Sequence, residues 1–128
     1  MSMETIKILA TEDTPNIILD RKSNVFEFSG RSMPEDSGLF YEPIVEWFED
    51  YSKNPNPETI ITFKLIYFNT ASSKLILDIL SLLDAMHKKG HQVKINWYYP
   101  EDDEDMQEAG EEYCDILDVP FEHIAYVL

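Results

Sequence analysis

Cysteine, glycine and long apolar runs are scarce in this sequence of 128 residues. Cys114 is the only cysteine, which excludes an internal disulfide framework and favours a reducing, cytoplasmic location. No apolar run approaches the roughly 20 residues of a membrane-spanning helix, and the first residues lack the pattern of a signal peptide. The length suits one domain with a buried core. We therefore expect a single cytoplasmic domain over residues 1–128 and no membrane partner.

Basic residues are also few, because ten Lys and Arg stand against 25 Asp and Glu, for a net charge of −15 at pH 7. Binding to nucleic acid or anionic lipid depends on clustered Lys and Arg, which this chain lacks. A content of 44% hydrophobic and 12% aromatic residues opposes a disordered chain. We expect no nucleic-acid partner, and the acidity suits either a basic surface on another protein or solubility alone.

Groups suited to catalysis are sparse. His87, His91 and His123 occur without a serine or cysteine in a recognisable nucleophile motif, and four glycines form no nucleotide loop. Cys114 lies among apolar residues and suits a small core position. The acidic stretch 101–105 could attract a hard cation, but it lacks the spaced ligands and turn glycine of a calcium loop, and acids also suit a helix start. We expect no enzyme and no cofactor, with an acidic metal-binding protein or enzyme as the lesser alternative.

Apolar residues recur with the periods of alternating strands and helices. The expected strands span residues 6–10, 16–20, 25–29, 59–68, 92–99 and 121–127. The expected helices span 40–51, after a loop over 32–38, then 75–87 and 105–117. The second and third strands form a hairpin, and the strand–helix–strand order that follows predicts a βαβ unit with parallel strands. The fold class is therefore α/β, a two-layer fold with a mixed sheet and helices mainly on one face.

Three details make this prediction specific. Gly30 is expected where the backbone needs a conformation that side chains forbid. Pro43 is expected in the first turn of its helix, where its missing N–H has no intrahelical partner. The strand 59–68 is apolar on both faces, which is typical of a central strand. Alternation places on one face Ile61, Phe63, Leu65 and Tyr67, and on the other Ile60, Ile66 and Phe68.

The stretch 67–74, Tyr-Phe-Asn-Thr-Ala-Ser-Ser-Lys, joins this central strand to the next helix. A helix N-terminus presents unpaired N–H groups and a partial positive charge, which can receive a phosphate from a ligand or one attached to the protein. Thr70 is therefore either an ordinary helix cap or a site of phosphorylation. The acidic stretch 101–105 is expected at the same carboxyl edge of the sheet, so a phosphate on Thr70 would add to a negative patch.

A helical wheel at about 100° per residue orients the hydroxyls of this stretch. Ser72 points toward the core, Ser73 lies near the edge, and Thr70 lies on the outward side. The same outward side carries Lys74, Leu77, Ser81, Asp84 and Lys88. Leu77 gains nothing from burial there, so it is a candidate docking contact beside Thr70.

Four short motifs carry a resemblance to a known family. They are Ser-Gly-Arg-Ser-Met-Pro-Glu at 29–35, Tyr-Phe-Asn-Thr at 67–70, Gly-His-Gln-Val at 90–93 and Asn-Trp-Tyr-Tyr at 96–99, the last followed by acids. In this order they resemble the SiaC-type regulatory phosphoproteins, over nearly the whole chain from residue 10 to residue 121. The resemblance implies a fold similar to STAS domains, the class of the anti-sigma-factor antagonists.

The resemblance also implies a signalling function. Thr70 would be phosphorylated by a dedicated protein kinase and dephosphorylated by a PP2C-like phosphatase. In the best-known branch of the family the unphosphorylated protein binds and activates a diguanylate cyclase, which raises cyclic di-GMP and favours biofilm. Ala71 stands where many relatives carry a hydroxyl, so it cannot replace Thr70 as acceptor.

The candidate partner-binding residues surround this threonine, and they are Asn69, Thr70, Ser73, Lys74, Leu77 and Arg31. Arg31 reaches a phosphate on Thr70 only if its loop lies nearby, and a surface ion pair is the alternative. The competing hypothesis is a constitutive protein-interaction adaptor in which Thr70 is only a helix N-cap.

Overall fold

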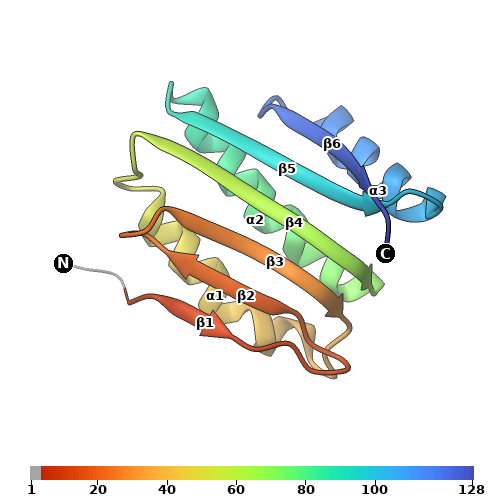
Figure 1. Ribbon diagram of the computed structural model, residues 1–128. Helices are drawn as coiled ribbons and strands as arrows, with labels where there is room; N and C mark the ends of the chain where they lie inside the picture. Colours follow the sequence, from red (N-terminus) through yellow and green to blue (C-terminus); the bar gives the residue numbers. More distant parts are fainter. Residues whose placement is uncertain (1–3) are drawn as a thin grey trace.

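The computed structural model describes residues 4–128, which form a six-stranded sheet and three helices (Figure 1). The strands are β1 (Ile6–Ile8), β2 (Asn16–Asp20), β3 (Val25–Ser32), β4 (Glu58–Phe68), β5 (Gln92–Pro100) and β6 (Phe121–Tyr126). The helices are α1 (Ser37–Tyr51), α2 (Thr70–Lys88) and α3 (Glu104–Ile116). The strands lie in chain order across the sheet, antiparallel from β1 to β3 and parallel from β3 to β6. The predicted hairpin and parallel βαβ unit are confirmed.

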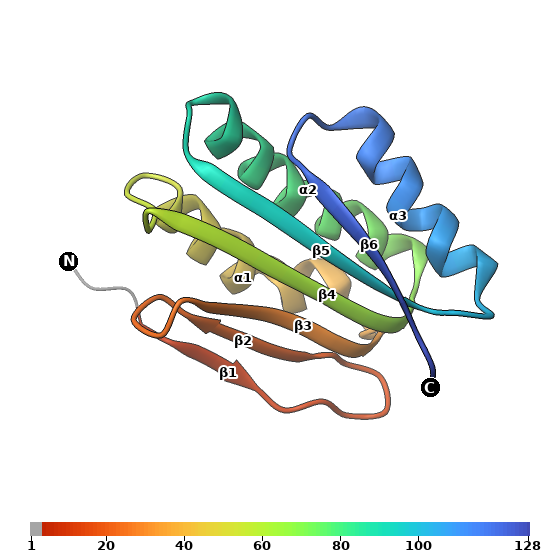
Figure 2. The ribbon, with the colours of Figure 1, turned by 45° about the horizontal axis from the view of Figure 1, so that its top comes forward.

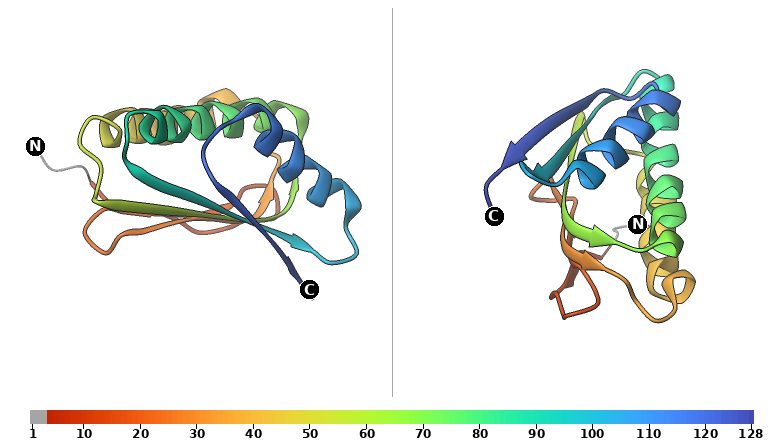
Figure 3. Two further views of the ribbon diagram at one scale, coloured as in Figure 1. Left: turned by 90° about the horizontal axis from the view of Figure 1, so that it is seen from above. Right: turned by 90° about the vertical axis from the view of Figure 1, so that its right-hand side faces the viewer.

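The helices all cover one face of the sheet, as the view from above shows (Figure 3). They follow chain order across it, with α1 behind β3 and β4 and α3 beside β6 (Figure 2). The predicted two-layer fold with a mixed sheet is therefore confirmed. Within residues 4–128, no helix has the length and apolarity that a membrane crossing requires.

The core lies between the sheet and the helices. The rings of Phe28 and Phe63 stack at 4.7 Å and join β3 to β4. The apolar stripe predicted for the first helix is buried at Ile44, Trp47, Phe48 and Tyr51, while Phe40 is half-buried. Cys114 is only half-buried, so it does not occupy the buried core position predicted for it.

The first helix begins earlier than predicted, and Pro43 lies beyond its first turn. The Asp36 side chain caps α1 by accepting a hydrogen bond from the backbone N–H of Leu39 at 3.0 Å. The prediction that Pro43 lies in the first turn is therefore wrong. An interior proline leaves the carbonyl four residues earlier without its usual donor, here that of Leu39. Both residues are exposed, so water can reach this carbonyl.

A break in register at the end of β4 reverses the predicted faces of its last residues. Gly30 pairs with Leu65, but Arg31 pairs with Tyr67, so Ile66 is an extra residue in β4. Gly30 has a φ of 91°, which confirms the expected need for glycine. Beyond the extra residue the alternation inverts. Phe68 therefore turns under the helices, 6.2 Å from the ring of Trp97, and Tyr67 becomes 50% exposed.

Asp84 is buried, although the helical wheel placed it on the outward side of α2. Its Oδ1 accepts hydrogen bonds from the N–H groups of Asp118 at 2.8 Å and Val119 at 2.9 Å, and Lys88 lies 3.1 Å from its Oδ2. Burial alone would raise the pKa of Asp84, but the donors from Val119, Lys88 and Asp118 outweigh it and lower the pKa. This carboxylate joins α2 to the segment that enters β6.

Replacing Asp84 by alanine should lower the free energy of unfolding by about 1–3 kcal/mol at pH 7, because buried donors lose their acceptor. A carboxyl whose folded pKa is lowered stabilises the fold above its unfolded pKa, and this is lost as pH falls through the folded pKa. The gap between wild type and Asp84→Ala should therefore narrow below about pH 4 in urea unfolding curves. Asp78→Ala, at an exposed site on the same helix, is the control and should change little. A gap that stays constant from pH 7 to pH 3 would contradict this role.

The contact of α3 with β5 requires a glycine at position 110, where α3 packs on the ring of Trp97. A Cβ on Gly110 would lie 2.4 Å from Cδ1 and 2.6 Å from Nε1 of Trp97. The Trp97 ring is buried, and its N–H donates to the carbonyl of Met106 at 3.0 Å, so it cannot move aside.

Gly110→Ala should therefore destabilise the protein by about 1–3 kcal/mol, as overpacked cores do. Glycine to alanine inside a helix ordinarily gains about 1 kcal/mol, so the expected effect has the opposite sign. Denaturant unfolding measures it, with Glu111→Ala at the exposed neighbouring position as the control. A more stable Gly110→Ala protein would show that α3 is free to shift on the sheet.

Candidate functional site

Asn69, and not Thr70, is the N-cap of α2. Its Oδ1 accepts a hydrogen bond from the N–H of Ser72 at 2.8 Å, and its carbonyl accepts one from the N–H of Ser73 at 3.0 Å. Thr70 is the first residue of the helix and is exposed. The hypothesis that Thr70 serves as the cap is therefore wrong, since this role is filled by the preceding residue.

Four buried hydroxyls lie beneath this helix start, and we call Ser32, Ser37, Tyr41 and Ser72 the hydroxyl cluster. The Ser32 hydroxyl lies 2.5 Å from that of Tyr41 and donates to that of Ser72 at 2.9 Å. The Ser37 hydroxyl lies 3.4 Å from that of Ser72. Burial raises the pKa of Tyr41 to about 12, so the cluster is uncharged at neutral pH. The cluster joins the end of β3 to the starts of α1 and α2.

The two serines of the stretch, Ser72 and Ser73, are less accessible than Thr70. Ser72 is buried in the hydroxyl cluster, as the wheel predicted. Ser73 is half-buried, and its hydroxyl donates to the carbonyl of Thr70 at 2.7 Å. The Tyr113 hydroxyl of α3 donates to the carbonyl of Ser73 at 2.9 Å, which holds α3 against the first turn of α2. Of Thr70, Ser72 and Ser73, only Thr70 is exposed.

Thr70 lines a groove with acidic walls on the side of α3. One part, of about 300 Å³, is lined by Phe68, Asn69, Thr70, Ser73, Ala109, Glu112 and Tyr113. The adjoining part, of about 290 Å³, is lined by Ile66, Tyr67, Phe68, Asp103, Asp105, Met106 and Ala109. The two parts share Phe68 and Ala109, and we call them together the acidic groove. The expectation that Thr70 and the stretch 101–105 share one edge of the sheet is confirmed.

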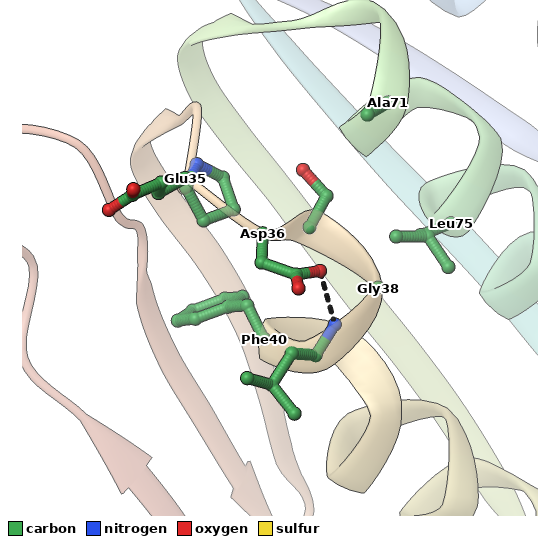
Figure 4. A pocket seen from close by; sticks show the side chains of 9 residues that line it. Glu35, Asp36, Gly38, Phe40, Ala71 and Leu75 are labelled. Atoms are coloured by element: carbon green, nitrogen blue, oxygen red, sulfur yellow. Dashed lines mark hydrogen bonds between the residues drawn. The ribbon is translucent and has the colours of Figure 1, made fainter.

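A second groove lies on the other side of α2, against the start of α1 (Figure 4). This apolar groove, of about 790 Å³, is lined by Pro34, Glu35, Asp36, Ser37, Gly38, Leu39, Phe40, Ala71 and Leu75. Glu35 and Asp36 stand on the α1 side, while α2 contributes only Ala71 and Leu75 (Figure 4). The groove was not predicted from the sequence. Asp36 could have indicated it, because an aspartate in this position is a signal for the start of a helix. Leu39, three residues later, lies outside the apolar stripe of that helix and is therefore exposed.

The structure does not bring all the candidate partner-binding residues together. Ser32 points under the helices to the hydroxyl cluster, so strand alternation turns Arg31 to the helix-free face of the sheet. Leu77 is half-buried and packs against the core, so its placement on the outward face is wrong. Lys74 is exposed one turn after Thr70. Asn69, Thr70, Ser73 and Lys74 thus form the compact part of the candidate site.

The acidic stretch 101–105 starts a helix. The Asp103 side chain accepts a hydrogen bond from the N–H of Met106 at 3.0 Å, and Glu104 and Asp105 occupy the first turn of α3. In the part of the chain that the structure describes, no group of three or more His, Cys, Asp or Glu is placed to hold a metal ion. The geometry therefore favours helix capping over the metal-binding alternative.

Comparison with known proteins agrees with this geometry. The family described as SiaC family regulatory phosphoprotein matches residues 8–126. An uncharacterized protein of Pseudomonas aeruginosa strain UCBPP-PA14 is 30% identical over 119 residues, which cover 93% of this chain and 94% of the relative. The structure of SiaC of Pseudomonas aeruginosa, 29% identical, matches with a TM-score of 0.88 over 97% of this chain and 100% of that chain.

A further solved structure contains a protein similar to this chain in complex with a partner. The crystal structure of the diguanylate cyclase SiaD in complex with its activator SiaC, from the same organism, contains a chain that matches with a TM-score of 0.89. That chain is 30% identical, and the match covers 94% of this chain and 99% of that one. The fold and the family resemblance predicted from the sequence are both confirmed.

Unfolding experiments can test whether Asn69, and not Thr70, caps α2. Asn69→Ala should lower the free energy of unfolding by about 0.5–2 kcal/mol, the usual cost of losing a cap. Thr70→Ala should change it by less than about 0.5 kcal/mol, since the side chain is exposed and caps nothing. Thermal or urea unfolding of both proteins at equal pH gives the comparison. Equal losses for the two variants would return the capping role to Thr70.

Proposed function

The chain belongs to the SiaC family of regulatory phosphoproteins, and from this premise we propose that it is a non-enzymatic signalling switch phosphorylated on Thr70. The observation that carries the proposal is that Thr70 is exposed at the start of α2 while Asn69 caps the helix. A modification of Thr70 therefore leaves the cap intact. Ala71 has no hydroxyl, and Ser72 is buried, so the neighbouring residues do not compete as acceptors.

Phosphorylation would change the surface more than the fold. A phosphate adds about −1.5 to −2 charges at a neutral side chain. The N-terminus of α2 favours a negative charge by about 0.3–1 kcal/mol at an exposed site. Glu112 lines the same part of the acidic groove as Thr70 and disfavours the phosphate by charge repulsion. These opposing local effects leave partner binding as the property that changes most.

Of the three proposed partners, only the cyclase has a counterpart in a solved complex of a relative, and the kinase and phosphatase come from the family resemblance. A protein kinase and a PP2C-like phosphatase set the state of Thr70, and a diguanylate cyclase is the downstream partner, by analogy with the complex solved for a relative. We propose that the unphosphorylated form binds and activates this cyclase, which raises cyclic di-GMP and favours biofilm. In this proposal residues 1–128 act as a single cytoplasmic regulatory domain.

The first test is mass spectrometry of the protein isolated from its native host under several growth conditions. We expect one phosphate in some conditions, mapped to Thr70. The second test measures binding to the host's diguanylate cyclase. Thr70→Glu should weaken binding by roughly tenfold or more, as charges introduced into interfaces do, while Thr70→Ala should retain it.

Ser81→Glu is the matched control, because Ser81 is an exposed hydroxyl residue on the same helix, three turns from Thr70. It should bind the cyclase as wild type does. If Thr70 is unmodified in every condition and Thr70→Glu binds normally, the protein is a constitutive adaptor. Loss of binding in both glutamate variants would point to the net charge of α2 and not to Thr70.

A further inference from the structure

We propose that Lys74 is the second residue of the switch and forms an ion pair with the phosphate on Thr70 along the surface of α2. The pairing rests on the proposed function, because it requires a phosphate on Thr70, and it adds the side chain that receives this phosphate. Three observations carry it. They are the position of Lys74 one helical turn after Thr70, its lack of an ion pair, and the acidic surroundings of both residues.

Lys74 lies four residues after Thr70 on α2, and both side chains are exposed. Residues four positions apart are neighbours on a helix surface, with about 5–6 Å between their Cβ atoms. The Cα–Cβ bonds of a helix tilt toward its N-terminus, which favours an approach of the Lys74 ammonium group to Thr70 over one to Asp78. An anion four residues before a lysine is also the more favourable of the two orders.

The ammonium group of Lys74 is available to an anion. Among the described residues, the ion pairs involve Lys53, Lys88 and Lys94, and Lys74 forms none, although Asp78 follows it by four residues. A phosphate on Thr70 would therefore gain this partner without breaking an existing ion pair. Arg31, the other basic residue considered for this phosphate, is turned to the helix-free face of the sheet.

The surroundings of Thr70 are otherwise acidic. Within the part of the chain that the structure describes, residues 70–77 contain no other Lys, Arg or His, and no basic residue lines the acidic groove or the apolar groove. Tyr113 also lines the acidic groove, but burial raises its pKa, so its hydroxyl stays uncharged. The acidic side chains that line the two grooves are Asp103, Asp105 and Glu112 on the α3 side and Glu35 and Asp36 on the α1 side. Among these side chains, Lys74 alone attracts a phosphate on Thr70.

The pairing enlarges the change that a partner meets. In the unmodified protein, Lys74 presents a free positive charge at an acidic edge of the molecule. After phosphorylation this charge is paired, so a partner loses a cation and meets an anion at one place. The ion pair also holds the phosphate on the surface of α2 and away from Glu112.

The test is a 31P NMR titration of the protein with phosphothreonine at position 70, incorporated during synthesis. A neighbouring cation favours the dianionic phosphate and lowers its second pKa, whereas a neighbouring anion raises it. Lys74→Gln should therefore raise the second pKa of the phosphate by about 0.2–0.4, as expected for an exposed pair at this spacing. Lys74→Arg keeps the charge and should keep the wild-type value. Glu112→Gln should shift this pKa in the opposite direction, downward.

Lys89→Gln is the matched control, because it removes the same charge at the exposed C-terminal end of α2. It should leave the pKa of the phosphate unchanged. The difference between wild type and Lys74→Gln should shrink at about 1 M salt, since salt screens exposed ion pairs. Equal pKa values for wild type and Lys74→Gln, or equal shifts for Lys74→Gln and Lys89→Gln, would refute the pairing.

The titration does not depend on a kinase of the host, so it separates the pairing from the proposed function. If Lys74 shifts the pKa while the protein isolated from its host never carries a phosphate on Thr70, the pairing holds and the proposed function is refuted. If the host protein is phosphorylated on Thr70 but Lys74 leaves the pKa unchanged, the proposed function holds and the pairing is refuted.

Discussion

The hydroxyl cluster fixes the geometry on which the rest of the site depends. Ser32 ends β3, Ser37 and Tyr41 belong to the start of α1, and Ser72 belongs to the start of α2. Buried hydroxyls without partners would be costly, so these elements hold one relative position. The carbonyl of Ser32 also accepts the N–H of Asn69 at 2.9 Å, which anchors the residue that caps α2. Thr70 therefore follows a cap that is held in place, and it lines the acidic groove while the next residue, Ala71, lines the apolar groove.

Much of this arrangement could be predicted because it depends on local patterns. The β2–β3 hairpin, the parallel pairing of β4 with β5 and the outward position of Thr70 follow from apolar periodicity and from the strand–helix–strand sequence. The position of Thr70 at the same edge of the sheet as the acidic stretch 101–105 follows from the same topology, because parallel strands bring their carboxyl ends together.

The predictions failed at residues whose position is determined by contacts with segments far away in the sequence. The extra residue at Ile66 is defined only by pairing with Gly30 and Arg31, and it inverts Tyr67 and Phe68. Asp84 is buried because Asp118 and Val119, 34 and 35 residues later, present backbone donors to it. The hydroxyl cluster links residues up to 40 positions apart, and a helical wheel shows only that Ser72 points inward. Leu77 likewise gains its contacts from the core and not from its own helix.

A phosphorylation switch on this fold must alter partner binding without unfolding the domain, and the free energies of the two processes allow this. Domains of this size are stable by about 5–15 kcal/mol, whereas a phosphate at an exposed helix start changes stability by at most about 1 kcal/mol. Binding is more sensitive, because a tenfold change in affinity needs only about 1.4 kcal/mol. The support beneath Thr70 carries no charge and does not use the threonine side chain. The modification is therefore felt almost entirely at the surface, where a partner that packs beside α2 must either accommodate the hydrated phosphate or leave.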